Sequence, residues 1–201
     1  MYKVGITGGI GSGKTTICKV FEVLGIPVFY ADTEAKNIMV QDELLIEGIK
    51  SAFGKKSYFD DGKLNNKHIA GIVFSNEAEL EKLNALVHPA VFRAFYTWEA
   101  KVGPNVPYTL KEAALLFESG SYKMCDTNIL VTAPSDVKIN RVMQRDKITA
   151  EQVKARMDKQ MSDEEKAKMA DHFIINDEKN SIIEQVLVLH KQFLKIASNL
   201  K

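Results

Sequence analysis

The chain has 201 residues, 45% of them hydrophobic, which suffices to bury the core of one α/β domain with an insertion or two. Its 27 basic and 26 acidic residues leave a formal net charge of +1, so we expect no bulk attraction to nucleic acid or to an anionic membrane. The two cysteines do not have metal-binding spacing, and no apolar run approaches the ~20 residues of a membrane span. The first expected strand begins so early that we expect no signal peptide before it. These observations favour a cytoplasmic protein.

The first expected element is a short buried strand, Lys3–Thr7, which leads into a glycine-rich loop. Residues 8–15 read GGIGSGKT and match the phosphate-loop pattern, in which backbone N–H groups converge on phosphate oxygens. In this pattern the lysine reaches the β- and γ-phosphates and the threonine hydroxyl binds Mg²⁺. The expected nucleotide-binding residues are Gly9, Ile10, Gly11, Ser12, Gly13, Lys14, Thr15 and Thr16, with Lys14 also catalytic and Thr15 also a metal ligand.

A helix is predicted directly after the loop, from about Lys14 to Gly25. Its apolar stripe has helical spacing and comprises Ile17, Val20, Phe21 and Leu24. The helix N-terminus would point its unpaired N–H groups and the positive end of its dipole at a bound anion. Strand, glycine loop and helix together are the setting that a phosphate loop requires.

Asp32 follows the second expected strand, Ile26–Ala31. A carboxylate at the C-terminal end of a parallel strand lies at the edge of the sheet where such folds bind ligands. It is therefore a candidate catalytic base or organiser of a magnesium site. Asp32 also begins a segment with helical spacing, so an ordinary helix cap is the alternative, and the spacing alone leaves both open.

Residues 33–102 are helical in pattern and form an insertion between two strands of the sheet. We expect one helix capped by Ser75 and carrying Leu83 and Val87, and another that carries Val91 and Phe95. An insertion of this length implies a helical subdomain, a natural place for a second substrate. His88 stands before Pro89, where the spacing favours a structural residue at a helix junction over a ligand.

Two acidic residues follow the insertion. Glu112 lies near the end of a third expected strand, Val106–Ala113, and is the best-placed carboxylate to help hold a hydrated Mg²⁺. Glu118 is either a second functional carboxylate or a residue at a helix start or on the surface. The fourth expected strand is Asn128–Ala133.

A basic segment follows the fourth strand. We expect Ser135 to cap a helix that leaves Lys138, Arg141 and Arg145 exposed. Thr149 with Gln152, and Ser162 with Glu165, indicate two further helix starts. A solvated helical face is the usual explanation of such basic runs, but next to a phosphate loop we favour a mobile lid that closes arginines over the phosphates.

The last expected elements are a fifth strand, His172–Asn176, and a helix with Ile182, Val186, Leu189, Phe193 and Ala197 inward. The predicted fold is thus α/β, a three-layer P-loop NTPase fold with a five-stranded parallel sheet, a helical insertion and a small helical lid. We expect a core of residues 1–32, 103–140 and 170–201, an acceptor subdomain of residues 33–102, and a lid of residues 141–169.

This plan is typical of a small-molecule kinase. A nucleotide switch of the GTPase kind is disfavoured, because the sequence has neither a guanine-reading Asn-Lys-x-Asp motif nor an Asp-x-x-Gly switch motif. Neutral charge and small size disfavour an ATPase that handles DNA or RNA. The residues by themselves lead to a kinase of a small acceptor, with nucleoside monophosphate kinases among the alternatives.

Four motifs in order make the sequence similar to the dephospho-coenzyme A kinase family: GITGGIGSGKT at 5–15, Ala31-Asp32, LVHP at 86–89 and LLFE at 115–118. The similarity continues through residues 144–146, 156–160 and 170–176, and so covers essentially the whole chain. It implies transfer of the ATP γ-phosphoryl group, with Mg²⁺, to the ribose 3′-hydroxyl of dephospho-coenzyme A. The implied partners are these two small molecules, in a monomer or weak homo-oligomer.

The resemblance also implies roles for single residues. Asp32 matches the general base, and His88 and Glu118 are assigned with it to the acceptor site. Arg141 and Arg145 would approach the ATP phosphates or base on lid closure, with Asn176 near the adenine. The sequence departs from the family pattern twice, with Tyr30 where an Asp is usual and Ala114 where a Pro is usual.

Overall fold

The computed structural model describes residues 1–74 and 76–200, which divide into two compact units. The first unit comprises residues 1–30 and 102–200 and contains the sheet. The second comprises the described part of residues 31–101 and is helical. No helix among the described residues is both long and apolar enough to cross a membrane.

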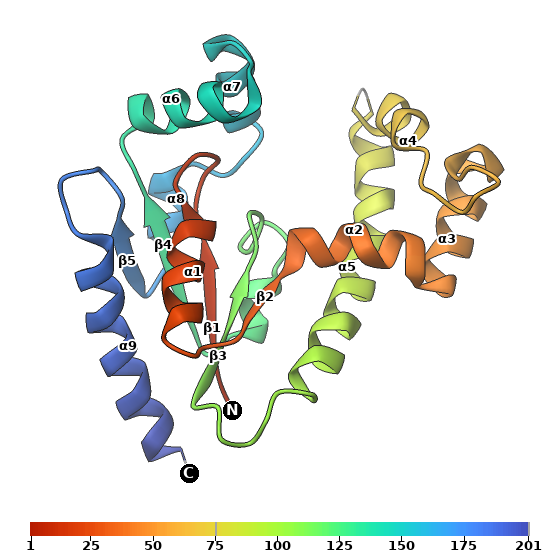
Figure 1. Cartoon of the computed structure of the whole chain (residues 1–201). Helices are drawn as coiled ribbons and strands as arrows, with labels where there is room; N and C mark the ends of the chain where they lie inside the picture. Colours follow the sequence, from red (N-terminus) through yellow and green to blue (C-terminus); the bar gives the residue numbers. More distant parts are fainter. Residues whose placement is uncertain (75, 201) are drawn as a thin grey trace. The chain divides into compact units, whose positions relative to one another are not determined.

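The first unit is built on one five-stranded parallel sheet (Figure 1). The strands are β1 (Tyr2–Thr7), β2 (Val28–Tyr30), β3 (Tyr108–Glu112), β4 (Thr127–Thr132) and β5 (His172–Ile175). They lie side by side in the order β2-β3-β1-β4-β5. All five expected strands are present, with ends that differ by one or two residues, and the predicted fold class is confirmed.

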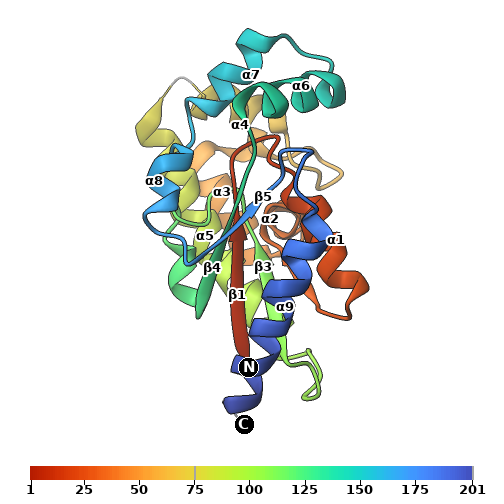
Figure 2. The same cartoon turned by 90° about the vertical axis from the view of Figure 1, so that its left-hand side faces the viewer.

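One face of the sheet is covered by α1 (Lys14–Val23) and α9 (Ile182–Asn199), which pack against each other as well (Figure 2). The expected stripe of α1 is buried at Ile17 and Phe21, and that of α9 at Val186 and Phe193. These side chains share one core with inward residues of β1, β3, β4 and β5. The phosphate loop therefore lies between a buried strand, β1, and a helix, α1, that is packed firmly against the core.

The segment between β4 and β5 holds three helices: α6 (Ser135–Asp146), α7 (Ala150–Met157) and α8 (Asp163–Ala167). Both predicted capping boxes are confirmed, with Thr149 and Gln152 at α7 and Ser162 and Glu165 at α8. The prediction that Ser135 caps α6 is wrong, because Ser135 is the first helical residue and Pro134 precedes it. Proline suits a helix start, where its missing N–H is not needed. A short 3₁₀ helix, Ser121–Met124, precedes β4.

The second unit contains α2 (Ala31–Gln41), α3 (Glu43–Phe53), a 3₁₀ turn at Lys55–Ser57, α4 (Asn66–Val73) and α5 (Glu77–Glu99). The predicted cap Ser75 lies outside the described residues. Asn76 caps α5, its side chain accepting hydrogen bonds from the N–H groups of Ala78 and Glu79. The stripes that the sequence spacing indicated are buried on α3, at Leu45, Ile49 and Phe53, and on α5, at Val87 and Phe95. The helix α4, which buries Ile69 and Val73, was not predicted.

The expected break at His88-Pro89 is wrong, because α5 continues through both residues. A proline inside a helix removes one backbone hydrogen bond and costs about 3 kcal/mol. The buried stripe of α5 runs across the proline without interruption, from Val87 through Val91 to Phe95. Packing of that stripe offsets the local cost, so one helix forms where the local sequence predicted two.

Candidate active site

The phosphate loop joins β1 to α1 in backbone conformations that glycine allows. Gly11 and Gly13 have φ angles of 80° and 91°, in the left-handed region where other side chains are strained. A side chain at Gly13 would also collide with the amide nitrogen of Asn176. Because α1 begins directly at Lys14, the N–H groups of its first turn and the positive end of its dipole border the loop. An anion-binding helix terminus has this local structure.

Within the loop, Lys14 Nζ donates to the carbonyl oxygen of Gly8 at 2.8 Å. Thr15 and Thr16 are exposed in the first turn of α1. Ser12 is buried, and its hydroxyl has no hydrogen-bond partner within the described part of the chain. The loop thus combines a cation, accessible hydroxyls and helix-terminal N–H groups within a few residues.

Lys138 and Asp163 lie over the start of the loop, and sequence analysis did not identify them as a pair. Their side chains form an ion pair at 2.8 Å, and Lys138 Nζ is 3.6 Å from where a Cβ on Gly9 would be. The expectation that Lys138 is exposed is wrong, because only 6% of its side chain is accessible. The partners are 25 residues apart, so no local spacing could predict the pair.

The segment after α7 also contacts the loop. Gln160 accepts a hydrogen bond from the backbone N–H of Ile10 at 3.0 Å. Gly9, Lys138, Gln160 and Asp163 line a pocket of about 530 Å³ together with residues 133–135, 157, 158, 161, 162, 164 and 165. The phosphate loop and the region predicted to be a lid therefore share one cavity within the first unit.

Asn176 and Arg141, both expected near the nucleotide, are joined to the loop by hydrogen bonds. The Asn176 side-chain nitrogen donates to the carbonyl oxygen of Ser12 at 2.8 Å. Arg141 donates to the backbone oxygen of Asn176 at 3.2 Å and to its side-chain oxygen at 3.3 Å. Arg141 also pairs with Glu178 at 3.2 Å. The structure therefore brings these two predicted residues together beside the phosphate loop.

Arg145, the other predicted lid arginine, is turned away from these contacts. Two of its guanidinium nitrogens donate to the carboxylate of Asp146, at 2.7 and 3.2 Å. Arg156 donates to the same carboxylate at 2.8 Å. These bonds lower the pKa of Asp146 and raise that of Arg145. The Arg145 side chain is 63% exposed, so an approach to phosphate would require it to leave this pair.

Glu118 lies in an ion pair with Lys166, at 3.0 Å. Lys166 is fully buried and also donates to the carbonyl oxygen of Ala114 at 3.4 Å. Glu118 accepts a second hydrogen bond from the N–H of Met161 at 3.1 Å. Glu118 thus anchors the segment between α7 and β5.

Glu112 is the last residue of β3 and only 6% exposed. In the sheet it lies opposite Ile6 of β1, one residue before the end of that strand and close to the start of the phosphate loop. Its other neighbour is Tyr30 of β2, whose hydroxyl donates to Glu22 at 3.1 Å. One carboxylate and the Thr15 hydroxyl are the oxygen donors that a hydrated Mg²⁺ bound to phosphates needs. The described residues contain no cluster of three or more metal-binding side chains.

The remaining predicted residues, Asp32 and His88, belong to the second unit. Asp32 is exposed and is the second residue of α2, inside its first turn instead of at a cap position. His88 is on α5, where its ring stacks on Phe92 with a centroid distance of 6.5 Å. Burial lowers the pKa of His88 below its usual value of 6.5, so its neutral form is favoured at neutral pH.

Comparisons with known proteins agree over nearly the whole chain. The family model for dephospho-CoA kinase matches residues 2–182. The chain belongs to the dephospho-CoA kinase family. It is therefore a kinase, and the resemblance drawn from the four motifs is confirmed.

Individual relatives support the same conclusion. Dephospho-CoA kinase of Salinibacter ruber is 43% identical over 178 residues, which cover 88% of this chain and 89% of the relative. A crystal structure from Thermus thermophilus has a TM-score of 0.84 at 32% identity and covers 95% of this chain and 96% of that chain. Dephospho-CoA kinase from Campylobacter jejuni has a TM-score of 0.68 at 30% identity, with 96% and 97% covered.

Proposed function

We propose that the protein transfers the γ-phosphoryl group of ATP to the ribose 3′-hydroxyl of dephospho-coenzyme A, giving coenzyme A and ADP. The observation that carries the proposal is a complete phosphate loop between β1 and α1 in a chain of the dephospho-CoA kinase family. The family implies the acceptor, and the loop supplies the donor site. We further propose that the reaction takes place in the cytoplasm.

In the donor site, the phosphates of ATP lie against the loop of residues 9–16. The N–H groups at the start of α1 donate to phosphate oxygens, and the helix dipole favours their charge. Lys14 leaves the Gly8 carbonyl and neutralises charge on the β- and γ-phosphates. Because charge builds up on these oxygens in the transition state, Lys14 contributes to binding and to catalysis.

The Thr15 hydroxyl and the Glu112 carboxylate would hold Mg²⁺ together with the phosphates. Bound there, the ion would supply neutralising charge to oxygens of the β- and γ-phosphates. The oxygen donors fit this ion, since Mg²⁺ in kinases uses one or two protein ligands besides water and phosphate. Glu112 is held rigidly by its place in the sheet, which suits a ligand that fixes position.

Asp32 acts as the general base that accepts the proton of the ribose 3′-hydroxyl as its oxygen attacks the γ-phosphorus. His88 and Glu118 are assigned to the acceptor site by the family resemblance. Arg141 and Asn176 are held together beside the loop and serve the adenine side of ATP. Arg145 approaches the transferring phosphate when residues 141–169 close as a lid, after exchanging its bonds to Asp146.

A coupled assay of ADP release across a panel of acceptors tests the proposal. We expect turnover of dephospho-coenzyme A that depends on ATP and Mg²⁺, with coenzyme A as the product identified by mass. Nucleoside monophosphates are the matched alternative acceptors. Rapid phosphorylation of a nucleoside monophosphate, with dephospho-coenzyme A left unchanged, would show that the acceptor assignment is wrong.

A further inference from the structure

The face of the sheet that is turned away from α1 and α9 carries polar side chains at its centre. Leu110 and Ile129 point into the core beneath α1 and α9, so their neighbours Lys111 and Asn128 point to the other face. In the sheet, Gly5 of β1 lies between Lys111 of β3 and Asn128 of β4. A lysine, a glycine and an asparagine therefore form one row across three strands.

Lys111 is a buried cation in this row, with only 1% of the residue exposed. Its Nζ donates to the sulfur of Met124 at 3.1 Å, and Met124 directly precedes Cys125. Burial lowers the pKa of Lys111 to about 8, whereas the negative charge of Cys125 raises it. Burying a charge is costly unless an opposite charge lies near it. The thiolate form of Cys125 supplies such a charge to Lys111.

Cys125 lies over the middle of the row and is only partly buried. Its Sγ is 3.2 Å from the point that a Cβ on Gly5 would occupy. The carboxylate of the next residue, Asp126, accepts a hydrogen bond from the N–H of Lys3 at 2.7 Å, which offsets part of its charge. A thiol that solvent reaches and that lies beside a cation has the surroundings of a reactive cysteine.

The third member of the row, Asn128, has an acceptor that is not used. Asn128 is only 7% exposed, and its side-chain oxygen has no hydrogen-bond partner among the residues that the structure describes. This oxygen lies over Gly5, as Cys125 Sγ does. Buried acceptors in folded proteins nearly always have a donor. A group that binds at Cys125 should therefore bring an N–H close to its own sulfur.

We propose that Cys125 is a modification site, which undergoes thiol–disulfide exchange with small disulfides that carry an amide N–H two carbons from the sulfur. The Cys125 thiolate attacks one sulfur of the disulfide and forms a new S–S bond. The old S–S bond breaks, and its electron pair leaves on the second sulfur, which takes a proton from water. Cys125 is oxidised and the released half is reduced to a thiol, so the disulfide is the only oxidant. Lys111 stabilises the attacking thiolate, and Asn128 accepts the amide N–H.

Two sources supply this chemistry. Glutathione disulfide has an amide nitrogen two carbons from each sulfur, and so has the disulfide of coenzyme A. The second source has the same thiol-bearing arm as the acceptor and product of the proposed kinase reaction. The modification site does not depend on that reaction, because neither ATP nor phosphoryl transfer takes part in the exchange.

The other cysteine of the chain, Cys18, is the internal control. It is fully buried, and burial raises the pKa of its thiol, so it should not react. The whole protein is incubated at pH 7.5 with glutathione disulfide and, separately, with coenzyme A disulfide. Intact mass and peptide mapping should find one addition, at Cys125 alone, with at least one of the two. The disulfide that reacts faster identifies the source.

Three variants test the neighbours of the thiol. Lys111→Met removes the buried charge and should slow exchange at pH 7 about fivefold, with the rise of rate displaced to higher pH. Lys123→Met is its control, because Lys123 is exposed and two residues from Cys125, and it should change the rate less than twofold. Asn128→Leu should lower the equilibrium yield of mixed disulfide about threefold. An unmodified Cys18 shows that each variant is folded.

The unchanged protein also gives a test without substitution. At pH 7, Cys125 should exchange faster in the folded protein than in urea, where Lys111 no longer lies beside it. Addition at neither folded cysteine, equal addition at both, or a slower reaction in the folded protein would overturn the site. Equal rates for Lys111→Met and Lys123→Met would overturn the role of Lys111. An unchanged yield in Asn128→Leu would overturn the choice of amide-bearing disulfides.

Discussion

The carboxylate of Asp32 lies in the first turn of α2, where an acidic side chain stabilises a helix through the dipole. Glu34 occupies the same turn and accepts a hydrogen bond from Asn37 at 3.3 Å. Both residues can therefore stabilise the N-terminus of α2. Only Asp32 is proposed to touch the acceptor hydroxyl, so exchanging each for its amide separates chemistry from helix stability.

We expect Asp32→Asn to lower kcat by about a hundredfold or more, because a positioned general base contributes about 10²–10⁴ to the rate. The affinity for ATP should stay within about twofold, since the amide keeps the size of the side chain. Glu34→Gln should leave kcat nearly unchanged. Steady-state kinetics and nucleotide titration measure both quantities. A variant with normal kcat, or one that loses ATP binding and rate together, would rule out Asp32 as the base.

Among the elements between β4 and β5, two ion pairs with different surroundings connect separate helices. Lys138 of α6 pairs with Asp163 of α8 while almost fully buried. Asp146 at the end of α6 pairs with Arg156 of α7, whose side chain is 52% exposed. Removing one partner of a buried pair leaves an uncompensated charge, whereas an exposed pair contributes about 0–1 kcal/mol.

We therefore expect Lys138→Met to lower the free energy of unfolding by about 2 kcal/mol and Arg156→Met by less than about 1 kcal/mol. Chemical denaturation of the two variants and the unchanged protein gives the comparison. The Lys138 variant should also weaken ATP binding, because the pair lies over Gly9. Equal losses of stability in both variants would show that the Lys138 pair contributes no more than an exposed one.

For the whole molecule, the local sequence was sufficient for most features that depend on neighbours in the chain, the cap expected at Ser135 being an exception. It predicted the phosphate loop with its flanks, the five strands and both capping boxes, because each is set by spacing of a few residues. It could not predict the burial of Lys138 or the contact of Gln160 with Ile10. These pairings join residues 25 and 150 positions apart, and they form only when the segment between β4 and β5 folds over the phosphate loop.

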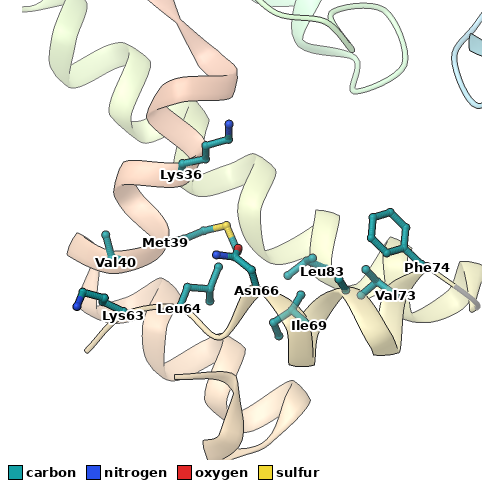
Figure 3. Close-up of a pocket in the computed structure, with 11 residues that line it drawn as sticks. Lys36, Met39, Val40, Lys63, Leu64, Asn66, Ile69, Val73, Phe74 and Leu83 are labelled. Atoms are coloured by element: carbon teal, nitrogen blue, oxygen red, sulfur yellow. The ribbon is translucent and has the colours of Figure 1, made fainter. Parts of the chain in front are cut away.

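The error at Pro89 also comes from contacts that the local sequence does not contain. Proline and the residue before it disfavour a helix locally, but α5 is kept intact by the packing of its buried stripe against other parts of the unit. Of the candidate site, the sequence indicated Asn176 and Arg141, which the structure joins to each other and to the loop. A pocket of about 820 Å³ in the second unit has no motif, since its lining comes from α2, α4, α5 and the turn before α4 (Figure 3).

Stability of the whole molecule should fall in mild acid because of three partly buried histidines. Burial lowers the pKa values of His88, His172 and His190 below the 6.5 of an exposed side chain. Below pH 6.5 the unfolded chain therefore binds protons that the folded protein does not, and the free energy of unfolding decreases with falling pH. Well above pH 6.5 all three are neutral in both states and this contribution is complete.

We expect the midpoint of thermal unfolding to be lower at pH 5.5 than at pH 7.5 by roughly a few degrees. His172→Gln should reduce that difference, since its ring packs on Phe193 at a centroid distance of 5.2 Å and glutamine does not titrate. The comparison uses the change between the two pH values within each protein, so a general loss of stability in the variant does not affect it. A midpoint that stays constant or rises on acidification would contradict the assignment of neutral, buried histidines to the folded state.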